Sequence, residues 1–301
     1  MNHRKKTSTF KRMLAFGVAA ALVLGSMIPA FADSSNTYVS LGADLTAEQR
    51  ATVLQIFGLT EADLSEIEVA QVTNAMEHQY LDNYLPASVI GTKALSCVRV
   101  DKTDSRGIRV TTHNISYCTD GMYQNALTTA GIENADVTVA APFSISGTAG
   151  LVGAMQAYQG ITGKKINEEN ADAAIQEIVT TGELGEALGN ENAENVIALV
   201  KQKVAESKGA SDEEILQMID EGCKEIGVSL TDAEKQQVLA LMKKIAKLDL
   251  DTDKLMEQAS NIYDRLKDMG VDVSDLDKDT LLSGLKKIFE GFMNFLKGLF
   301  S

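Results

Sequence analysis

The stretch VTVAAPFSISGTAG, Val137 to Gly150, decides the fold class of this chain. Its first half is a run of β-branched and small apolar residues, which predicts a buried strand. Its second half continues into SGTAGLVGAMQAYQG, whose apolar residues have helical spacing. A strand that passes through a turn directly into a helix is typical of α/β and α+β proteins, which often bind phosphate or place a nucleophile there.

Two strand-like segments precede this stretch. TKALSCVRV and GIRVTTHNISYC flank the turn-rich DKTDSR, so we predict a β-hairpin in which Val100 faces Ile108. The next segment, CTDGMYQNALTTAGI, predicts a helix that is capped by Thr119 and ends at Gly131. The predicted order is β, β, α, β, α.

Helical patterns flank this small sheet core on both sides. Before it, a short polar leader is followed by LGADLTAEQRATVLQIFG, in which Thr46 and Gln49 form a capping box. LTEADLSEIEV and TNAMEHQYLDNYLP predict further helices. After it, successive segments with polar starts and glycine ends predict an all-helical region. We expect an α+β (or α/β) fold, with a mixed core at 33–165 and a larger helical region at 166–278.

The N-terminus has the three parts of a secretory signal peptide. MNHRKKTSTFKR is basic, MLAFGVAAALVLGSMIPAFA is apolar, and the run ends in small residues at Ala30 and Ala32. We predict that residues 1–32 are cleaved before Asp33 and that the mature protein is exported. Pro29 disfavours the alternative of an uncleaved helical anchor.

The chain is acidic, with a formal net charge of −14. Removal of the basic leader takes this to about −19. Such a surface repels nucleic acid at long range, so we expect no nucleic-acid partner.

The turn after Val137 fits neither a phosphate-binding loop nor a nucleophile elbow. A P-loop needs Gly-Lys-Ser/Thr, and an elbow needs Gly-x-Ser-x-Gly; neither pattern is present. We expect Ser146 to cap the following helix, while Gly147 allows close packing. The functional alternative is an anion or ligand bound at the helix N-terminus by Ser144, Ser146, Gly147 and Thr148.

Histidines and acidic clusters do not indicate a catalytic or metal site. Only His78 and His113 lie outside the leader, and no local signature assigns either to a catalytic triad. DLDTDKLMEQAS begins like a calcium-binding loop, but Lys254 and Ser260 stand where that loop requires Gly and Glu. We predict no catalytic residue, metal or cofactor.

The cysteines suit an oxidising compartment only in part. Cys97 and Cys118 are candidates for a disulfide, which leaves Cys223 unpaired. In the predicted hairpin Cys97 faces Thr111, about 23 Å along the strand from Cys118, so a bridge requires the strand to end or turn back near Asn114. The alternative is a Cys118 thiol with a low pKa beside a helix N-terminus.

Two further features suit contact with a partner. A basic patch in and around the predicted hairpin fits an anionic cell-wall polymer, or is a charged edge that prevents aggregation; its residues are Lys93, Arg99, Lys102, Arg106 and Arg109. Residues 279–301 form an amphipathic helix that would dock on the helical region, pair with a second copy or lie on a membrane surface, using Phe289, Phe292, Leu296 and Phe300.

Four separated segments carry a family resemblance: LGADLTAEQR, IGTKALSCV, TTGELGE and NISYCTDGMYQNALTTAGIENADVTVAAPFSISGTAGL. In these segments the chain resembles the YpuA-like family of exported, mainly Gram-positive bacterial proteins of unknown function. It implies export and a Gram-positive envelope, and it transfers no activity, substrate or catalytic residue. We expect a non-enzymatic binding or scaffolding protein of the cell envelope; the alternative is a secreted hydrolase with a site near Ser144, Ser146 and Thr119.

Overall fold

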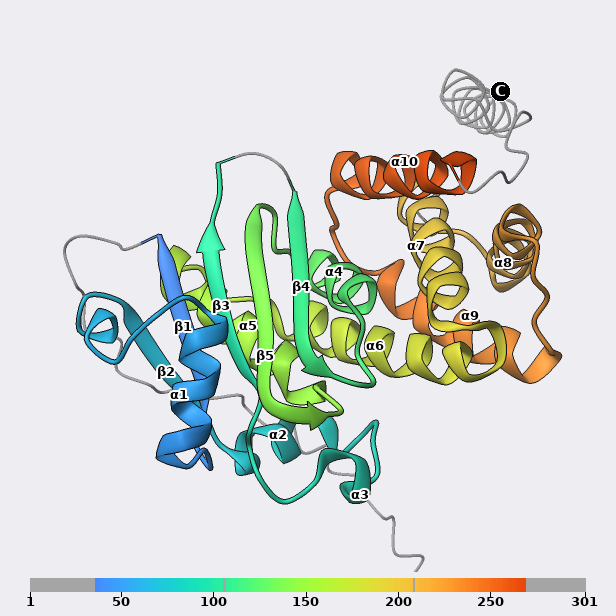
Figure 1. The fold of residues 1–301 in the computed structure, drawn as a ribbon. Coiled ribbons are helices and arrows are strands. Elements are labelled where there is room, and N and C mark those ends of the chain that lie inside the picture. Colours follow the sequence, from blue (N-terminus) through green and yellow to red (C-terminus); the bar gives the residue numbers. More distant parts are fainter. Residues whose placement is uncertain (1–35, 105–106, 208, 269–301) are drawn as a thin grey trace, which may run out of the picture. The chain divides into compact units, whose positions relative to one another are not determined.

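A five-stranded sheet lies at the centre of the computed structural model, which describes residues 36–104, 107–207 and 209–268 (Figure 1). The strands have the order β2-β1-β3-β5-β4. β1 is parallel to β2 and β4 is parallel to β5, whereas β3 is antiparallel to both of its neighbours. The strand bounds are β1 Thr37–Gly42, β2 Glu68–Val72, β3 Cys97–Lys102, β4 Ile108–Ile115 and β5 Ala135–Ile145.

The predicted hairpin is wrong, because β5 lies between β3 and β4. Val100 pairs with Val137 and not with Ile108, and Ile108 pairs with Ala135. β5 is the most apolar of the three strands, and its buried side chains gain more from a position between two neighbours than from an edge. The sequence pattern identified all three strands but placed β5 wrongly.

The opening region is only partly helical. β1 forms where the polar segment before the first helix was expected to be irregular. The predicted helix LTEADLSEIEV instead contains the short 3-10 helix η1 (Asp63–Ser65) and the start of β2. Helix α1 (Ala47–Ile56) has the predicted capping box, and α2 (Asn74–Leu81) and α3 (Ala87–Ile90) follow β2. The sequence pattern did not predict β1. All but its first residue are buried, so the strand lacks the alternation of polar and apolar residues that marks a half-exposed strand.

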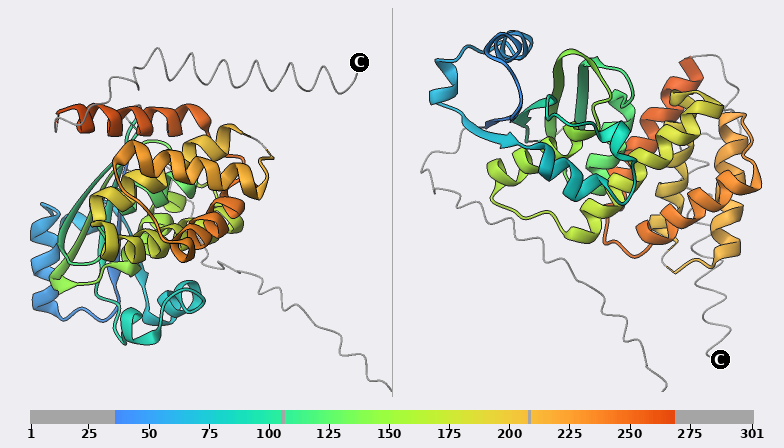
Figure 2. Two further views of the ribbon diagram at one scale, coloured as in Figure 1. Left: turned by 90° about the vertical axis from the view of Figure 1, so that its right-hand side faces the viewer. Right: turned by 90° about the horizontal axis from the view of Figure 1, so that it is seen from below.

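Helices cover the two faces of the sheet unequally. The main apolar core lies on the face covered by α4 (Asp120–Thr129) and α5 (Thr148–Thr162) (Figure 2). The opposite face has a small core under α1, built from Val39, Leu41, Val53, Phe57, Cys97 and Ala140. The rest of that face carries polar side chains such as Arg109 and Thr111, which are exposed.

The C-terminal part of the described chain is helical, as predicted. It consists of α6 (Glu168–Leu188), α7 (Asn190–Glu206), α8 (Asp212–Ile226), α9 (Asp232–Ile245) and α10 (Thr252–Asp268). These helices enclose a second apolar core. None of the described helices is long and apolar enough to cross a membrane. The predicted α+β class is confirmed.

Candidate functional site: the strand-to-helix turn and a buried polar seam along α4

Side chains of the protein itself fill the turn between β5 and α5. The Tyr123 hydroxyl donates a hydrogen bond to the Gly147 carbonyl. A Cβ atom added at Gly150 would lie 2.5 Å from the Tyr123 hydroxyl and 2.7 Å from Val139 Cγ1. The first turn of α5 is buried, with Thr148 only 3% exposed. The turn is therefore closely packed against β5 and α4.

Ser146 does not cap α5 as predicted. The N-cap is Gly147, which has a left-handed φ of 89° and provides no side-chain hydrogen bond. Ser146 instead continues the strand pairing, since its carbonyl accepts a hydrogen bond from the Cys118 N–H at 3.1 Å. Ser144 is exposed on the protein surface. Anion binding at this turn stays a prediction.

The most unusual chemistry lies elsewhere, in a buried ion pair between α6 and α7. Lys201 Nζ is 2.8 Å from Glu177 Oε1, and neither side chain has exposed surface. The ammonium also donates to the Asn125 carbonyl at 2.8 Å and to the Thr129 hydroxyl at 3.1 Å, so all three of its protons have acceptors. Burial lowers the pKa of Lys201, and the Glu177 carboxylate opposes this shift.

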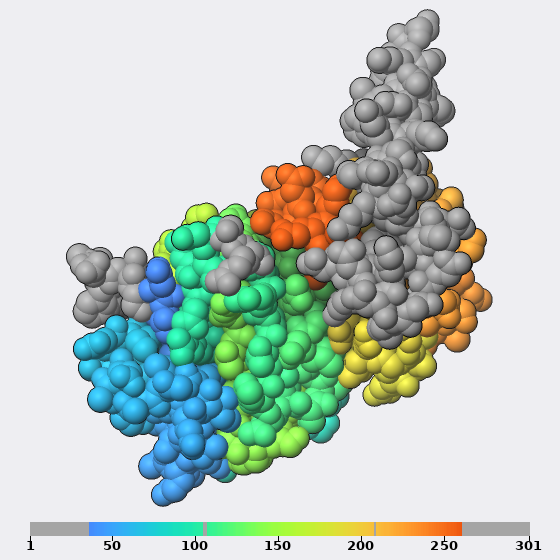
Figure 3. All heavy atoms as spheres, turned by 45° about the horizontal axis from the view of Figure 1, so that its top comes forward, coloured from blue at the N-terminus to red at the C-terminus, as the bar shows by residue number. Residues whose placement is uncertain are grey.

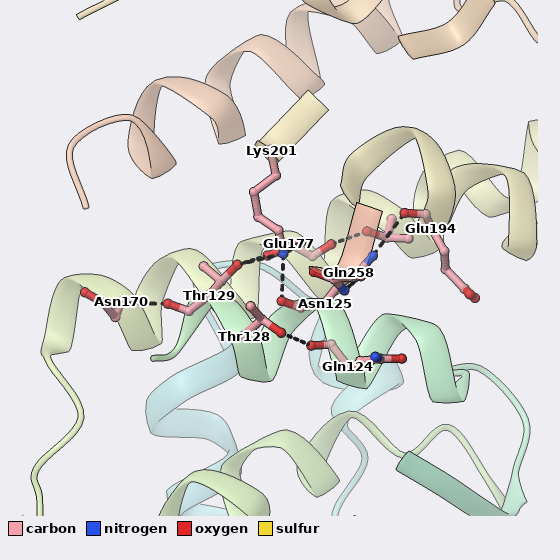
Figure 4. A network of polar contacts seen from close by, with 10 residues as sticks. Gln124, Asn125, Thr128, Thr129, Asn170, Glu177, Glu194, Lys201 and Gln258 are labelled. Atoms are coloured by element: carbon pink, nitrogen blue, oxygen red, sulfur yellow. Dashed lines mark hydrogen bonds and ion pairs between the residues drawn. The ribbon is translucent and has the colours of Figure 1, made fainter. Parts of the chain in front are cut away.

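Polar contacts continue from this ion pair along α4 (Figure 4). The Thr129 hydroxyl donates to the second Glu177 oxygen. The Asn125 amide donates to the Glu194 carbonyl at 3.0 Å, and its oxygen accepts from Gln258 on α10. We call this set the α4 seam: Thr119, Asn125, Thr129, Glu177, Glu194, Lys201 and Gln258. It joins α4, which packs on the sheet, to α6, α7 and α10.

Two glycines allow the helical part to approach α4 and the segment before it. A Cβ at Gly121 would collide with the Glu194 carboxylate, which accepts a hydrogen bond from the Thr119 hydroxyl at the start of α4. A Cβ at Gly182 would collide with the Tyr117 ring and hydroxyl. The N-terminus of α4 thus already has a negative charge from α7 beside it, which is favourable for a helix N-terminus.

Another buried carboxylate lies outside the seam. Glu77 on α2 is only 2% exposed and accepts a hydrogen bond from the Asn74 amide at 2.9 Å. Burial raises the pKa of Glu77 to about 7, with a smaller contribution from Asp44. No group of three His, Cys, Asp or Glu side chains among the described residues is arranged to hold a metal ion.

Two arginines of the predicted basic patch are already paired with aspartates. The Arg99 guanidinium binds both Asp101 oxygens and the Phe57 carbonyl beside α1. Arg109 binds Asp136 through two hydrogen bonds of 2.7 and 2.8 Å. Lys93 and Lys102 are exposed, and Arg106 lies outside the described residues. Wall-polymer binding by this patch stays a prediction.

The three cysteines are free thiols, so the Cys97–Cys118 bridge is absent from the structure. Cys97 belongs to the small core under α1, whereas Cys118 belongs to the main core on the other face of the sheet. The sheet therefore stands between the two sulfur atoms. Burial raises the pKa of both thiols to about 12, which also argues against a reactive Cys118 thiolate.

The two histidines of the described chain lie outside the α4 seam. His78 contacts Asp82 at 2.6 Å and the Gly91 carbonyl at 3.2 Å, and these contacts, the one with Asp82 above all, raise its pKa. His113 is exposed on β4. The predicted leader and the amphipathic segment with Phe289, Phe292, Leu296 and Phe300 lie outside the described residues.

Comparison with known proteins agrees with the resemblance seen in the sequence. Residues 41–262 match the family described as "Protein of unknown function (DUF1002)". The chain belongs to this family. It is also 38% identical over 258 residues to the uncharacterized protein YpuA of Bacillus subtilis (strain 168), covering 83% of this chain and 87% of that relative. No solved structure matches the chain.

The DUF1002 match covers every residue of the α4 seam, yet sequence reasoning did not identify the seam. A signal was present. Lys201 follows the apolar run VIALV, and Glu177 lies between Ile175 and Ile178. A lone charge in such a setting is a candidate for a buried pair, because an unpaired buried charge is very costly. Helical periodicity alone does not show which acid meets which base.

Proposed function

We propose that this protein is exported and acts as a non-enzymatic binding or scaffolding protein of the cell envelope. The observation that carries this proposal is the closely packed turn between β5 and α5. A strand-to-helix turn is where proteins of this class commonly place reacting groups, but here Tyr123 and Val139 lie against the first turn of the helix. The ion pair between Lys201 and Glu177 is fully enclosed and tethers α6 to α7.

Export is supported by the sequence of the N-terminus. The basic, apolar and small-residue parts of residues 1–32 have the order of a cleavable signal. Cell fractionation of the native host, followed by N-terminal sequencing, tests this directly. We expect the mature chain to begin at Asp33 outside the cytoplasm; an intact Met1 terminus in the cytoplasm would refute export.

Two surfaces are candidates for holding the protein in the envelope: the C-terminal amphipathic segment and the exposed basic side chains around β3. We would sediment the mature chain with anionic vesicles and with purified cell walls, at low and high salt. One variant replaces Phe289, Phe292, Leu296 and Phe300 with Ser, and the other replaces Lys93 and Lys102 with Glu.

The two variants distinguish the two surfaces. Loss of vesicle binding only in the first variant assigns the terminal segment to the membrane. Loss of salt-sensitive wall binding only in the second assigns the basic residues to an anionic polymer. If the unsubstituted chain sediments with neither vesicles nor cell walls, envelope binding is removed from the proposal.

A further inference from the structure

Pro142, Phe143 and Ser144 lie in a bulge near the end of β5, which we call the protrusion. His113 of β4 is opposite Ala140 of β5, but the next matched pair is Ile115 and Ile145. Residues 141–144 therefore bulge from β5 opposite the single residue Asn114. Asn114 has a left-handed φ of 59°, and its amide donates to the Ala141 carbonyl at 2.8 Å. The side chain thus pins the protrusion to β4.

The protrusion presents an aromatic side chain to the surroundings. Phe143 is 48% exposed, more than Val69 at 36% and Val89 at 37%, which are the other exposed large apolar residues of the described chain. Bulges commonly redirect a side chain, and strained backbone is retained where a function depends on it. Exposed aromatic side chains are frequent anchors of protein interfaces. Phe143 thus has the properties of a contact residue.

The protrusion adjoins an open sheet edge. Within the described chain β4 pairs only with β5. The Gly107 carbonyl accepts a hydrogen bond from the Ala135 N–H at 3.2 Å, so the backbone groups of alternate residues, Ile108, Val110 and Thr112, point away from β5. In Figure 3 green residues of the sheet region lie at the surface between blue α1 and orange α10. These outward N–H and C=O groups are a template for another strand.

Charge indicates which strand would fit this edge. Residues 107–117 contain no Asp or Glu, while Arg109 and His113 are exposed. Asp136 binds Nε and Nη2 of Arg109, and no partner is found for Nη1 within the described chain. Two copies paired antiparallel about Thr111 would place Arg109 opposite His113, and residues 107–117 of the second copy would bring no carboxylate to either side chain. A segment with carboxylates is therefore favoured over a second copy.

We propose that the β4 edge and Phe143 form one docking surface for an extended, acidic segment of another protein. The segment adds as a strand beside β4, its carboxylates meet Arg109 and His113, and Phe143 packs against it. This inference rests on the proposed binding function and specifies the class of partner. Main-chain hydrogen bonds supply affinity in this mode of recognition, and side chains supply selectivity.

The test uses a defined probe, a synthetic peptide of about ten residues in which Glu alternates with Val and Thr. Binding to the immobilised peptide is measured by interferometry with the full mature chain. The matched control peptide has the same sequence with alternate backbone nitrogens methylated, which removes hydrogen-bond donors without changing charge. We expect the methylated peptide to bind at least about tenfold more weakly.

Matched variants of the protein locate the contact. Thr112→Pro removes an outward N–H and leaves the donors that face β5, so we expect a loss of about tenfold, while Thr112→Val should bind normally. Phe143→Ser should also weaken binding, whereas Val69→Ser, at an exposed site on β2 at the opposite edge of the sheet, should not. If Thr112→Pro does not fold, the methylated peptide still tests strand addition.

Several outcomes would overturn the inference. Equal binding of both peptides, or no binding of either, excludes strand addition by an acidic segment. A dimer in analytical ultracentrifugation that Thr112→Pro abolishes would assign the edge to a second copy. Loss of vesicle binding on Phe143→Ser would assign the protrusion to a membrane. Because export and wall sedimentation are measured separately, failure here leaves the proposed function standing.

Discussion

Lys201 Nζ lies 2.8 Å from Glu177 Oε1 at a place where both side chains have no exposed surface. The pair joins α6 to α7, and the further contacts of Lys201 with Asn125 and Thr129 bring α4 into the same network. Removing one partner leaves the other charge buried without compensation, which is far more costly than losing an exposed ion pair.

We expect Lys201→Met to destabilise the fold by about 3 to 5 kcal/mol in urea denaturation. Lys243→Met is the matched control, because Lys243 pairs with Asp212 at 2.7 Å but about half of each side chain is exposed; its cost should be below about 1 kcal/mol. Combining Lys201→Met with Glu177→Leu should restore much of the loss, since no lone charge remains. Equal costs for the two lysine variants would contradict the role of the buried pair.

Glu77 should make stability depend on pH. Its pKa is raised from 4.5 to about 7, mainly by burial, so between these values the folded state holds a proton that the unfolded state has lost. The contribution of Glu77 to the free energy of unfolding is therefore greatest below about pH 4.5. It falls by up to about 3 kcal/mol as the pH rises through about 7.

Urea denaturation between pH 4.5 and 8 measures this effect. Glu77→Gln keeps an acceptor for Asn74 but cannot ionise, so we expect it to flatten the decline and to be more stable than the unsubstituted chain at pH 8. Glu66→Gln, at an exposed site, is the control and should leave the profile unchanged. An unaltered slope in Glu77→Gln would show that another group is responsible.

Gly182→Ala should destabilise the protein although alanine is the better helix former by about 1 kcal/mol. The added methyl collides with the ring and hydroxyl of Tyr117. We expect a net loss of about 1 to 3 kcal/mol in thermal or urea denaturation. Adding Tyr117→Ala removes the collision, so the glycine substitution should cost nothing further in that background. A stabilising Gly182→Ala would mean that α6 does not approach Tyr117 closely.

The thiols should be unreactive in the folded protein and free after denaturation. Cys97, Cys118 and Cys223 are buried, and burial raises the pKa of each thiol. We expect iodoacetamide to label them only slowly until denaturant is added. Intact mass spectrometry of protein purified without reductant gives the complementary measurement. A gain of two hydrogens on reduction would reveal a disulfide and contradict the three free thiols of the structure.

Local signals in the sequence predicted the helices well because the interactions that begin and end a helix are local. Thr46 and Gln49 form the expected capping box, and Thr119 accepts the expected hydrogen bond from the Met122 N–H. Gly163 and Gly227 end their helices in the left-handed conformation. Each of these contacts spans only a few residues, so composition and spacing reveal it.

Strand order and the α4 seam depend on contacts that no local pattern specifies. Val100 is equally suited to Ile108 or Val137 by residue type, and only the burial of β5 between two strands favours Val137. Lys201 and Glu177 are 24 positions apart, and Gln258 reaches Asn125 across 133 positions. The exposed Phe143 belongs to an apolar run that predicts burial, and its exposure follows from the pairing of Asn114 with Ala141.

The position of β5 also determines when the sheet can form during synthesis. β3 and β4 are made first, but the strand that joins them begins only at Ala135, after all of α4 has been added. A chain that is still emerging, from a ribosome or through a membrane, cannot complete this sheet until that point. Its contacts are necessarily late and of long range, which slows folding. For the export proposed above, this late completion of the sheet would leave the chain longer in the unfolded state that crossing a membrane requires.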